Sequence, residues 1–441
     1  MQNLIGWIIL LCFLSPGHAD DHWPQWRGPQ NTGVAPNGDP PIEWDNSRNI
    51  KWKRPIPGRG QSTPIIWGNT VYITTSVPFG EKVDHKALDH DHEHDHGAHD
   101  NMDPNSRHRF VVMAVDRSSG AVLWEKVVRE EIPHEPAHVT GSWASNSGVA
   151  DASGFIAFFG SRGLYALDHK GELQWEKDFG DMKVRHAHGE GSSPALHGNT
   201  LVINWDHQGQ SFLIAVNRKD GSVKWRVARE EITSWSTPLI VEHLGRPQVI
   251  VAATGRVRGY DLADGKVIWE CSGLSRNVVA TPVAADGMVY VANSYDFQAM
   301  LAIRLDKARG DISQSEAIVW KRDRHTPYVP SPLLYKGQLY FLRHNQGILS
   351  NLDAKTGETL YGPMRLPHLG QVFASPVGAA DRIYLSDRSG GTMVIERGPE
   401  FRVLAHNQLD DSFSASAAIS GKSLFLRGDQ FLYCIEELSP P

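Results

Sequence analysis

Cysteine is scarce in this sequence, with three residues in a chain of 441. One of them, Cys12, lies in an apolar stretch at the start of the chain. The other two, Cys271 and Cys434, belong to widely separated parts of the repeat pattern described below. A disulfide between them is therefore not expected, although two cysteines outside the cytoplasm can pair. We predict two buried free thiols.

Long apolar runs are missing after the first twenty residues, which excludes a later membrane-spanning helix. Residues 1–19 contain no Lys, Arg, Asp or Glu, and they include the apolar run Leu4–Leu14. They end in small residues at the positions where signal peptidases cut. This arrangement predicts a secretory signal peptide. We therefore expect a protein outside the cytoplasm, in the periplasm or secreted.

Neither sign of charge dominates, because 44 Lys and Arg face 50 Asp and Glu, for a net charge of −6. No basic stripe is present, which excludes nucleic acid as a partner. A sustained helical period is absent as well, and this favours an all-β fold. We expect the protein to be a monomer.

What the sequence does contain is a segment that returns about once every 45 residues, a period typical of propeller blades. Each copy opens with Ser or Thr followed by Pro, and leads through an apolar run to Asp-x-x-x-Gly-x-x-x-Trp. The clear copies open at Thr63-Pro64, Ser193-Pro194, Thr237-Pro238, Thr281-Pro282, Ser331-Pro332 and Ser375-Pro376. Ser147-Gly148 and Ser416-Ala417 are degenerate copies, which brings the number of repeats to eight.

The tryptophan of the repeat stands in what we expect to be the outermost strand. It occurs at Trp52, Trp124, Trp175, Trp225, Trp269 and Trp320, with Tyr361 and Leu404 in the same place near the end. We expect this large apolar side chain to pack between blades. Each repeat divides into four short strands, A to D, joined by turns rich in Gly and Asp. The prediction is an all-β, eight-bladed β-propeller with four antiparallel strands per blade, and seven blades is the alternative.

The ends of the chain predict how the ring closes. The last repeat ends after three strands, and the segment Asn49–Lys53 has strand character but no repeat of its own. Pairing the two completes the last blade and removes two exposed strand edges. We therefore predict a propeller over residues 49–437, preceded by an irregular arm, residues 20–48. Within the arm, Trp23–Pro29 is expected to pack on the ring as a clasp.

Several stretches resemble the pyrroloquinoline-quinone-type repeat family. The resemblance is carried by Ala114–Glu125 (AVDRSSGAVLWE) and Tyr260–Glu270 (YDLADGKVIWE), and similar stretches end at Trp175, Trp225 and Trp320. Within this family the chain is most similar to the BamB-like, secreted propellers of planctomycete-type bacteria. Their recurring phrases are similar to Trp23–Gly28 and His138–Ser145. The resemblance covers about residues 22–437 and implies the propeller fold.

The resemblance implies less about chemistry. Family members that oxidise alcohols or sugars hold the quinone against a tryptophan floor. The alcohol-oxidising members add a vicinal disulfide and a calcium site of Glu, Asn and Asp. The present sequence has no adjacent cysteines, and no Glu-Asn-Asp set falls on matching positions. Because a fold does not by itself determine an activity, we do not expect a bound quinone.

In a propeller the D–A and B–C loops lie on one face, called here the loop face. The A–B and C–D turns lie on the other, the turn face. The repeat register places only His169, His197 and His243 on the turn face. The loop face receives nine histidines: His134, His138, His186, His188, His207, His325, His344, His368 and His406. This uneven distribution favours the loop face as the binding surface.

A His/Asp-rich insertion, residues 76–109, also belongs to the loop face, between strands B and C of the first blade. Imidazoles interleaved with carboxylates are ligands for Zn(II), Cu(II) or Ni(II). The candidate metal ligands are His85, His90, His92, His94, His96 and His99. The alternative is a solvated acidic loop that binds metal only adventitiously.

Arginines occur near the B–C turn in five blades: Arg162, Arg256, Arg343, Arg388 and Arg427. They predict a cationic collar suited to carboxylate, sulfate or phosphate groups. The alternative is that they pair with nearby acids such as Asp387 or Asp429. Further members of the candidate ligand site are Trp143, Arg185, His186, His188, Asp206, His207, Trp235, Tyr328 and His344.

Three functions compete on this evidence. The leading hypothesis is a secreted, non-catalytic scaffold that binds a protein, an anionic small molecule or a polysaccharide on its loop face. The second is a quinone-dependent dehydrogenase of alcohols or sugars. The third is an extracytoplasmic metal buffer that displays the His-rich loop. No catalytic residue can be assigned, because the repeats bring many Ser, His and Asp residues together by default.

Overall fold

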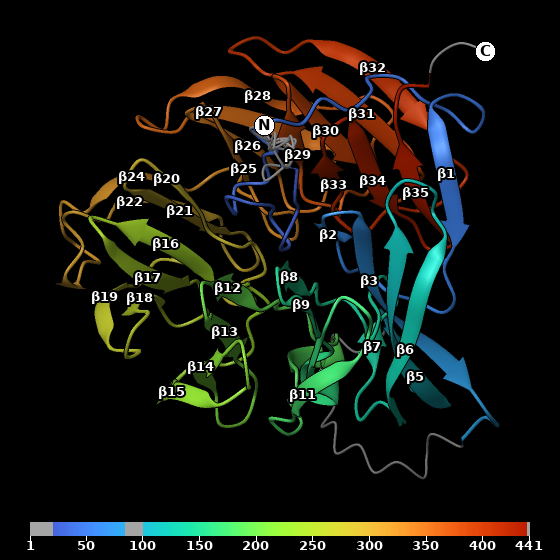
Figure 1. Cartoon of the computed structure of the whole chain (residues 1–441). Helices are drawn as coiled ribbons and strands as arrows, with labels where there is room; N and C mark the ends of the chain where they lie inside the picture. Colours follow the sequence, from blue (N-terminus) through green and yellow to red (C-terminus); the bar gives the residue numbers. More distant parts are fainter. Residues whose placement is uncertain (1–20, 84–99, 439–441) are drawn as a thin grey trace, which may run out of the picture.

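The four-strand repeats fold into antiparallel sheets that stand as blades around a central axis (Figure 1). The computed structural model describes residues 21–83 and 100–438. Within these ranges no helix is long and apolar enough to cross a membrane. The prediction of an all-β propeller with eight blades is confirmed, and the alternative with seven blades is wrong.

The first four blades each follow the chain from the inner strand A to the outer strand D. Blade 1 contains β2 (Ile65–Trp67), β3 (Thr70–Phe79), β5 (Arg107–Asp116) and β6 (Val122–Glu131). Blade 2 contains β8 (Val149–Asp151), β9 (Gly154–Phe158), β10 (Leu164–Leu167) and β11 (Leu173–Lys177). Blade 3 contains β12 (Ala195–His197), β13 (Thr200–Trp205), β14 (Phe212–Asn217) and β15 (Val223–Ala228). Blade 4 contains β16 (Leu239–His243), β17 (Arg246–Val251), β18 (Val257–Asp261) and β19 (Val267–Cys271).

The next three blades follow the same order. Blade 5 contains β20 (Val283–Ala285), β21 (Met288–Asn293), β22 (Ala299–Arg304) and β24 (Ile318–Arg322). Blade 6 contains β25 (Leu333–Tyr335), β26 (Gln338–Leu342), β27 (Ile348–Asp353) and β28 (Thr359–Arg365). Blade 7 contains β29 (Val377–Ala379), β30 (Arg382–Ser386), β31 (Gly391–Glu396) and β32 (Val403–Gln408).

Blade 8 closes the ring with strands from both ends of the chain. It combines β33 (Ala418–Ser420), β34 (Ser423–Arg427) and β35 (Phe431–Ile435) with β1 (Ile50–Pro55). In the β1–β35 register Trp52 lies opposite Cys434. The predicted closure is confirmed, with the strand two residues longer at its C-terminal end than the expected segment. The last blade is therefore held by non-covalent pairing between the two ends of the chain.

The Ser and Thr residues that open the repeats form a chain of hydrogen bonds around the axis. In each step the backbone N–H of one residue donates to the hydroxyl of its counterpart in the next blade, at 2.9 or 3.0 Å. The seven steps join Thr63, Ser147, Ser193, Thr237, Thr281, Ser331, Ser375 and Ser416 in that order. Both degenerate copies take part. Within the described residues only the Thr63 hydroxyl, at the seam between the last blade and the first, has no partner among the eight.

Because the Thr63 hydroxyl has no partner and the Thr237 hydroxyl has one, isosteric substitutions at these two positions should lower the unfolding free energy by different amounts. Thr237→Val removes the acceptor for the buried N–H of Ser193, which should cost about 1–3 kcal/mol of unfolding free energy. Thr63→Val removes a hydroxyl without a partner and should cost well under about 1 kcal/mol. Urea unfolding of the two variants measures both values. Equal losses would contradict the role assigned to the hydroxyl chain.

Five outer-strand tryptophans each join their own blade to the following one. Their indole N–H groups donate to a backbone carbonyl in the C–D turn of the following blade, at 2.9–3.1 Å. The ring lies over the turn glycine. A Cβ atom on Gly120, for example, would come within 2.6 Å of the Trp52 ring. The tryptophans that make this contact are Trp52, Trp124, Trp175, Trp225 and Trp320.

Trp269 departs from this pattern, although its sequence motif looks the same as the others. Its indole donates to Gln248 in its own blade, at 3.1 Å. The reason lies in blade 5, where the C–D turn is enlarged and contributes the short strand β23 (Gly310–Asp311). β23 pairs in parallel with β19, so that Trp269 lies opposite Gly310. Blade 4 thereby gains a fifth strand in place of the usual contact.

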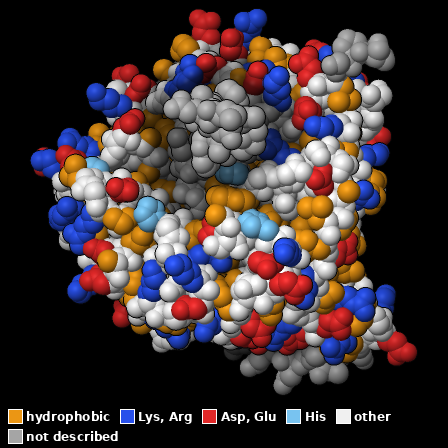
Figure 2. Space-filling view, viewed as in Figure 1, with side chains coloured by type: hydrophobic (Ala, Val, Ile, Leu, Met, Phe, Trp, Pro, Cys, Tyr) orange, Lys and Arg blue, Asp and Glu red, His pale blue; other side chains and the backbone are white. Residues whose placement is uncertain are grey.

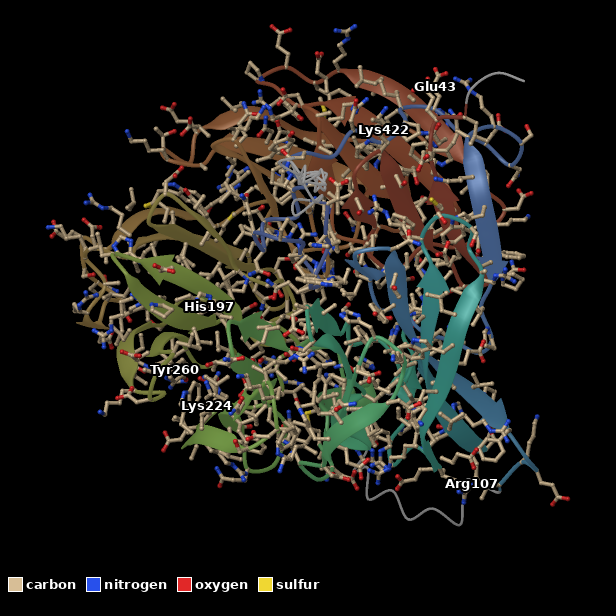
Figure 3. All side chains as sticks on the ribbon, viewed as in Figure 1. Glu43, Arg107, His197, Lys224, Tyr260 and Lys422 are labelled. Carbon is tan, nitrogen blue, oxygen red and sulfur yellow. The ribbon has the colours of Figure 1, made fainter. Side chains whose placement is uncertain are left out.

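The arm, which begins in the described part at Asp21, crosses the turn face. Trp23 is completely buried and exchanges two backbone hydrogen bonds with Ile66, at 3.0 and 2.9 Å. Further along, Ala35 donates its N–H to Gly378 O at 2.9 Å, and Asp39 donates to Gly421 O at 2.9 Å. Figure 3 shows Glu43 of the arm and Lys422 of the β33–β34 turn on the same side of the last blade. The arm thus ties the first blade to the last two on the turn face.

Both cysteines in the described part are buried free thiols, as predicted. Cys271 ends β19 and Cys434 lies in β35, in blades 4 and 8. Burial raises the pKa of each thiol to about 12. At neutral pH both side chains are therefore protonated and behave as small apolar groups.

The His/Asp-rich insertion is shorter than its sequence suggests. β3 and β5 continue into it, and the register pairs Phe79 with Arg107. Its C-terminal end forms β4 (Asn101–Met102), which pairs with β7 (Ala137–His138) on the loop face. All six predicted metal ligands, His85, His90, His92, His94, His96 and His99, lie outside the described residues.

Candidate functional site

A pocket on the loop face lies between blades 1, 2 and 3. It is a small hollow that is open in part to solvent. Its walls come from the D–A loop after blade 1, the B–C turn of blade 2 and the D–A loop after blade 2. The lining residues that could contact a ligand are His134, Glu135, Trp143, Ser161, Arg162 and Glu190.

The floor of the pocket depends on the tight B–C turn of blade 2. This turn is the 3-10 helix η3 (Gly160–Arg162), and Gly160 has a positive φ of 56°. A Cβ atom on Gly160 would lie only 1.4 Å from Glu190 Oε2. A glycine is therefore required both for the backbone conformation and for the close approach of the carboxylate. The backbone N–H of Ser161 donates to Glu190 Oε2 at 2.6 Å, and the Ser161 hydroxyl donates to the other oxygen.

Two carboxyl groups share the pocket, the buried Glu135 and the partly buried Glu190, whose side chain is 12% exposed. Glu135 accepts a hydrogen bond from the Val184 N–H at 2.9 Å and is 8% exposed. Burial raises the pKa of both carboxyl groups to about 7, and the charge of Glu135 contributes to the shift at Glu190. Near neutral pH such a pair can hold a proton, so it can donate as well as accept a hydrogen bond.

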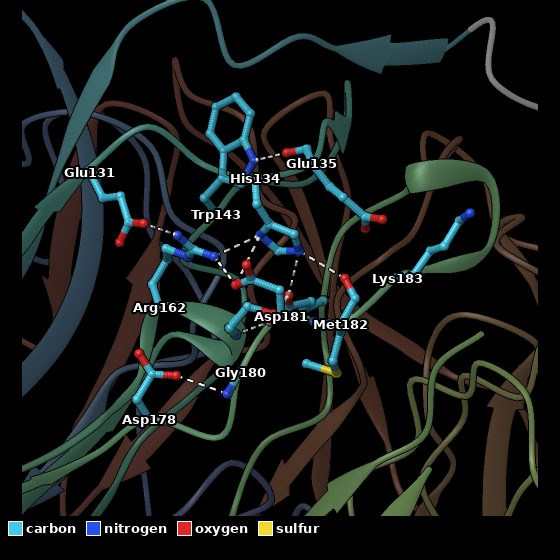
Figure 4. Close-up of polar contacts among 12 residues, drawn as sticks. Glu131, His134, Glu135, Trp143, Arg162, Asp178, Gly180, Asp181, Met182 and Lys183 are labelled. Atoms are coloured by element: carbon cyan, nitrogen blue, oxygen red, sulfur yellow. Dashed lines mark hydrogen bonds and ion pairs between the residues drawn. The ribbon is translucent and has the colours of Figure 1, made fainter. Parts of the chain in front are cut away.

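Arg162 and His134 connect the pocket to acids at its rim (Figure 4). Arg162 Nη1 pairs with Glu131 Oε1 at 2.7 Å, and Nη2 pairs with Asp181. Nη2 also donates to Nδ1 of His134 at 3.0 Å, while His134 Nε2 donates to the Met182 carbonyl at 2.8 Å. These contacts fix His134 as a neutral Nε2–H tautomer. Burial is the main cause of its lowered pKa, and Arg162 adds to it.

Trp143 forms the apolar wall of the pocket. Its indole N–H donates to the Glu135 carbonyl at 2.8 Å, which fixes the ring against the loop that carries Glu135. Its ring meets that of His108 edge-on, with centroids 4.6 Å apart. Burial lowers the pKa of His108 to about 4, so this contact is between uncharged rings at neutral pH. The pocket thus combines one aromatic wall with a polar floor, which is typical of ligand sites.

Two of the predicted site residues, His186 and His188, cluster with the loop-face His138 next to the end of the insertion. The His188 ring lies 4.9 Å from that of His138 and 5.3 Å from that of His186. Asn101 of β4 contacts His188 Nδ1 at 3.0 Å and donates to the His186 carbonyl at 2.8 Å. The described part of the chain nevertheless holds no group of three His, Cys, Asp or Glu residues arranged to bind a metal.

Other predicted residues serve the scaffold around the pocket. Asp206 is buried and pairs with Arg229 at 2.7 Å. His207 Nδ1 accepts the Lys183 N–H at 3.1 Å, and the Trp235 indole donates to the Gly189 carbonyl at 2.7 Å. These contacts hold the D–A loop that carries Glu190. Arg185, in η4 (Arg185–Ala187), contacts the neighbouring His186 ring nitrogen at 3.1 Å.

The five arginines of the predicted collar have separate surroundings. Arg162 belongs to the pocket, and Arg256 pairs with Asp311 at 2.8 Å and Glu270 at 3.1 Å. Arg427 is buried and donates to Ser62 of the neighbouring loop. Arg388 contacts Gln371 at 3.3 Å. On the face seen in Figure 2, which carries His197 of the turn face, positive and negative side chains are intermixed, and the predicted collar belongs to the opposite face. Pairing with acids is thus observed for two of the five, though not with the acids named from the sequence.

The remaining predicted residues lie across the loop face, near blades 5 and 6. The Tyr328 ring packs between Tyr295, at 5.8 Å, and His344, at 4.7 Å. Arg343 follows β26, directly before His344. His344 has a positive φ of 58°, an uncommon conformation for a histidine. The pocket around Glu190 is lined by other residues, from the loops of blades 1 to 3.

The acids of the pocket were missed by the sequence prediction. Glu135 and Glu190 come from two different D–A loops, and neither position repeats from blade to blade. The available signal is Glu190 between Gly189 and Gly191, since glycines on both sides allow close backbone approach. That signal does not show which residue the carboxylate meets.

The structure can also be compared with what the alcohol-oxidising family members need to hold their quinone. The two cysteines are in different blades, and the described residues supply no three-ligand metal group of His, Cys, Asp or Glu. Arg27 and Arg427, both buried, stand near the central axis with their guanidinium groups bonded to backbone or Ser62. The described residues therefore lack the vicinal disulfide of the alcohol-oxidising family members.

Comparison with known proteins agrees with the propeller fold described above. The model of the family described as outer membrane protein assembly factor BamB matches residues 108–361 and 272–438. The outer membrane protein assembly factor BamB of Moranella endobia (strain PCIT) is 26% identical over 340 residues, which cover 72% of this chain and 78% of the relative.

Solved structures share the fold at low identity. BamB from Moraxella catarrhalis matches with a TM-score of 0.55 and 12% identity, covering 87% of this chain and 98% of that one. The quinohemoprotein alcohol dehydrogenase from Comamonas testosteroni matches with a TM-score of 0.65 and 10% identity, covering 96% of this chain and 82% of that one. A europium-containing methanol dehydrogenase matches with a TM-score of 0.64 and 9% identity, covering 92% of this chain and 89% of that one. These likenesses show the fold alone.

Proposed function

The chain belongs to the family of the outer membrane protein assembly factor BamB, and on that premise we propose that it is a binding propeller of the cell envelope. Its loop face engages a partner protein, and the pocket around Glu190 receives a basic side chain of that partner. The location outside the cytoplasm rests on the signal peptide predicted in residues 1–19 and on the relative named for outer-membrane assembly.

The observation that carries this proposal is the pair of carboxyl groups beside Trp143, the buried Glu135 and the partly buried Glu190. Burial penalises both carboxylates, and a Lys or Arg side chain entering the pocket would supply the missing positive charge. The aliphatic part of such a side chain would pack on the Trp143 ring. Arg162 forms its ion pairs with Glu131 and Asp181, and its charge offsets the raised pKa of Glu190 only in part.

The experiment selects peptides from a random library on the intact protein and measures their affinity by titration calorimetry. We expect a consensus with a Lys or Arg. Trp143→Ala and Glu190→Gln should each weaken binding about tenfold, as loss of a charged hydrogen bond or an aromatic contact does. Glu242→Gln, an exposed substitution on the turn face, is the matched control and should leave affinity unchanged. Peptides without a basic residue, or unchanged binding by Glu190→Gln, would refute the proposal.

We further propose that the insertion binds a divalent metal. The support is its composition, together with the β4–β7 pairing that holds its end beside His138, His186 and His188. Metal analysis of protein purified without a His-affinity step, with and without residues 84–99, tests this. Equal metal content in the two proteins would contradict it. Saturable quinone binding with dye-linked oxidation of alcohols or sugars would instead favour the dehydrogenase.

A further inference from the structure

Three arginines from three separate loops gather on the loop face around β7. Arg59 lies between β1 and β2, Arg185 belongs to η4 in the D–A loop after blade 2, and Arg388 belongs to the B–C turn of blade 7. All three residues are partly exposed to solvent. We call this group the arginine cluster. Because its members come from different parts of the chain, only the closed ring brings them together.

Contacts around His138, the second residue of β7, bring Arg59 and Arg388 together. Arg59 Nη2 donates to the carbonyl of the next residue, Val139, at 2.9 Å. Arg388 lies close enough for its charge to act on the His138 ring. Burial is the main cause of the lowered pKa of His138, Asp100 opposes it, and Arg388 adds to it. The two arginines therefore reach the same histidine from different loops.

Neighbouring imidazole rings connect this pair to Arg185. The His188 ring lies 4.9 Å from the His138 ring and 5.3 Å from the His186 ring, and His186 Nε2 contacts Arg185 Nε at 3.1 Å. The backbone is joined as well, because the His138 N–H donates to the His188 carbonyl at 3.1 Å. Asn101 donates to the His186 carbonyl at 2.8 Å. The loops that carry Arg59 and Arg185 are thus held in a fixed relation.

No acid of the described ranges neutralises the arginine cluster. Within residues 21–83 and 100–438, no Asp or Glu forms an ion pair with Arg59, Arg185 or Arg388. Their side-chain partners are uncharged. Arg59 contacts the Met102 sulfur, and Arg388 donates to the Gln371 amide oxygen at 3.3 Å. All three guanidinium groups keep their positive charge at neutral pH.

Other arginines of the loop face show the contrast. Arg256, in the B–C turn of blade 4, pairs with Asp311 at 2.8 Å. Arg276 donates to both oxygens of Asp296, at 2.8 and 2.7 Å. The charge of Arg185 also contributes to the lowered pKa of Asp296, after the effect of Arg276, but Arg276 already occupies that carboxylate. The arginine cluster is therefore a local excess of positive charge in a chain of net charge −6.

We propose that the arginine cluster binds an acidic segment of a partner protein, whose Asp or Glu side chains pair with the guanidinium groups. A guanidinium group matches a carboxylate in shape and can bind it through two parallel hydrogen bonds. Three such groups suit a short segment with two or three acids. An anionic membrane surface fits less well, because it would repel a chain of net charge −6. The proposal does not rest on the basic ligand proposed for the pocket around Glu190.

Fluorescence anisotropy tests this with the full chain and a labelled hexapeptide of alternating Glu and Ser. We expect saturable binding that weakens as salt rises, and no binding of the matched peptide with Gln in place of Glu. Arg388→Met and Arg185→Met should each weaken binding about tenfold, the effect of losing a charged hydrogen bond. The control is Arg402→Met, in the C–D turn of blade 7, which removes an exposed arginine paired with Glu396 and should leave the affinity unchanged.

Absence of saturable binding, or equal affinity for the Gln peptide, overturns the proposal. An affinity that stays unchanged in the arginine variants also overturns it, and because Arg185 and Arg388 lie in different loops, either variant suffices if the other does not fold. Tighter binding of a sulfated hexasaccharide or of phosphatidylglycerol vesicles, lost in the same variants, overturns the assignment to a protein. Arg388→Met should keep its affinity for the Lys or Arg peptides selected on the pocket, which separates this proposal from the proposed function.

Discussion

Trp52→Ala should destabilise the propeller by about 3–5 kcal/mol, the usual cost of removing a large buried aromatic side chain. The indole is 9% exposed, packs 6.0 Å from the Phe425 ring and donates to the Arg117 carbonyl at 3.0 Å. It therefore joins the last blade to the first. Urea unfolding followed by tryptophan fluorescence and circular dichroism measures the loss.

The same substitution should also loosen the ring at one place. β1 is the edge strand of blade 8 and pairs with β35, so weakening its hold on the blade should expose the β35 amides to exchange. Trp320→Ala is the matched control, because Trp320 makes the same contact with Ala354 inside the continuous part of the chain. It should lower stability but leave the β35 amides protected. Equal exchange of β35 in both variants would show that closure does not depend on Trp52.

The closure of the ring and the number of blades were predictable because the sequence motifs that specify them recur along the chain. The Ser or Thr that opens each blade and the tryptophan that ends it perform the same contact several times, so one weak copy is supported by the others. Ser147 and Ser416 show this, since both lack the usual proline and still join the hydroxyl chain. The face on which a loop lies follows from the same register.

What does not repeat was not predictable. Trp269 has the motif of its counterparts, but the enlarged turn of blade 5 replaces its docking partner. The pocket around Glu190 depends on contacts between two D–A loops and one B–C turn, and their conformations carry no periodic signal. Arg27 was visible as part of a recurring phrase, yet only the fold shows that it lies inside the channel.

Glu190→Gln should change how stability depends on pH. In the native state the pKa of Glu190 is about 7, above its ordinary value of 4.5. The native protein therefore binds more protons than the unfolded chain between these values, and stability falls as pH rises from about 4.5 to about 7. The shift corresponds to a loss on the order of 3 kcal/mol, complete above the native pKa.

A glutamine at position 190 keeps the size of the side chain and can still accept the Ser161 N–H, but it has no charge to bury. The variant should match the wild type near pH 4.5 and exceed it at pH 8 by an amount on the order of 3 kcal/mol. Removing the charge at 190 also relieves Glu135, since the two groups interact. Urea unfolding at a series of pH values measures the difference, with Glu242→Gln as the exposed control. A difference between wild type and Glu190→Gln that stays constant from pH 4.5 to 8 would mean that Glu190 ionises without penalty, and the pocket would then have no need of a basic ligand.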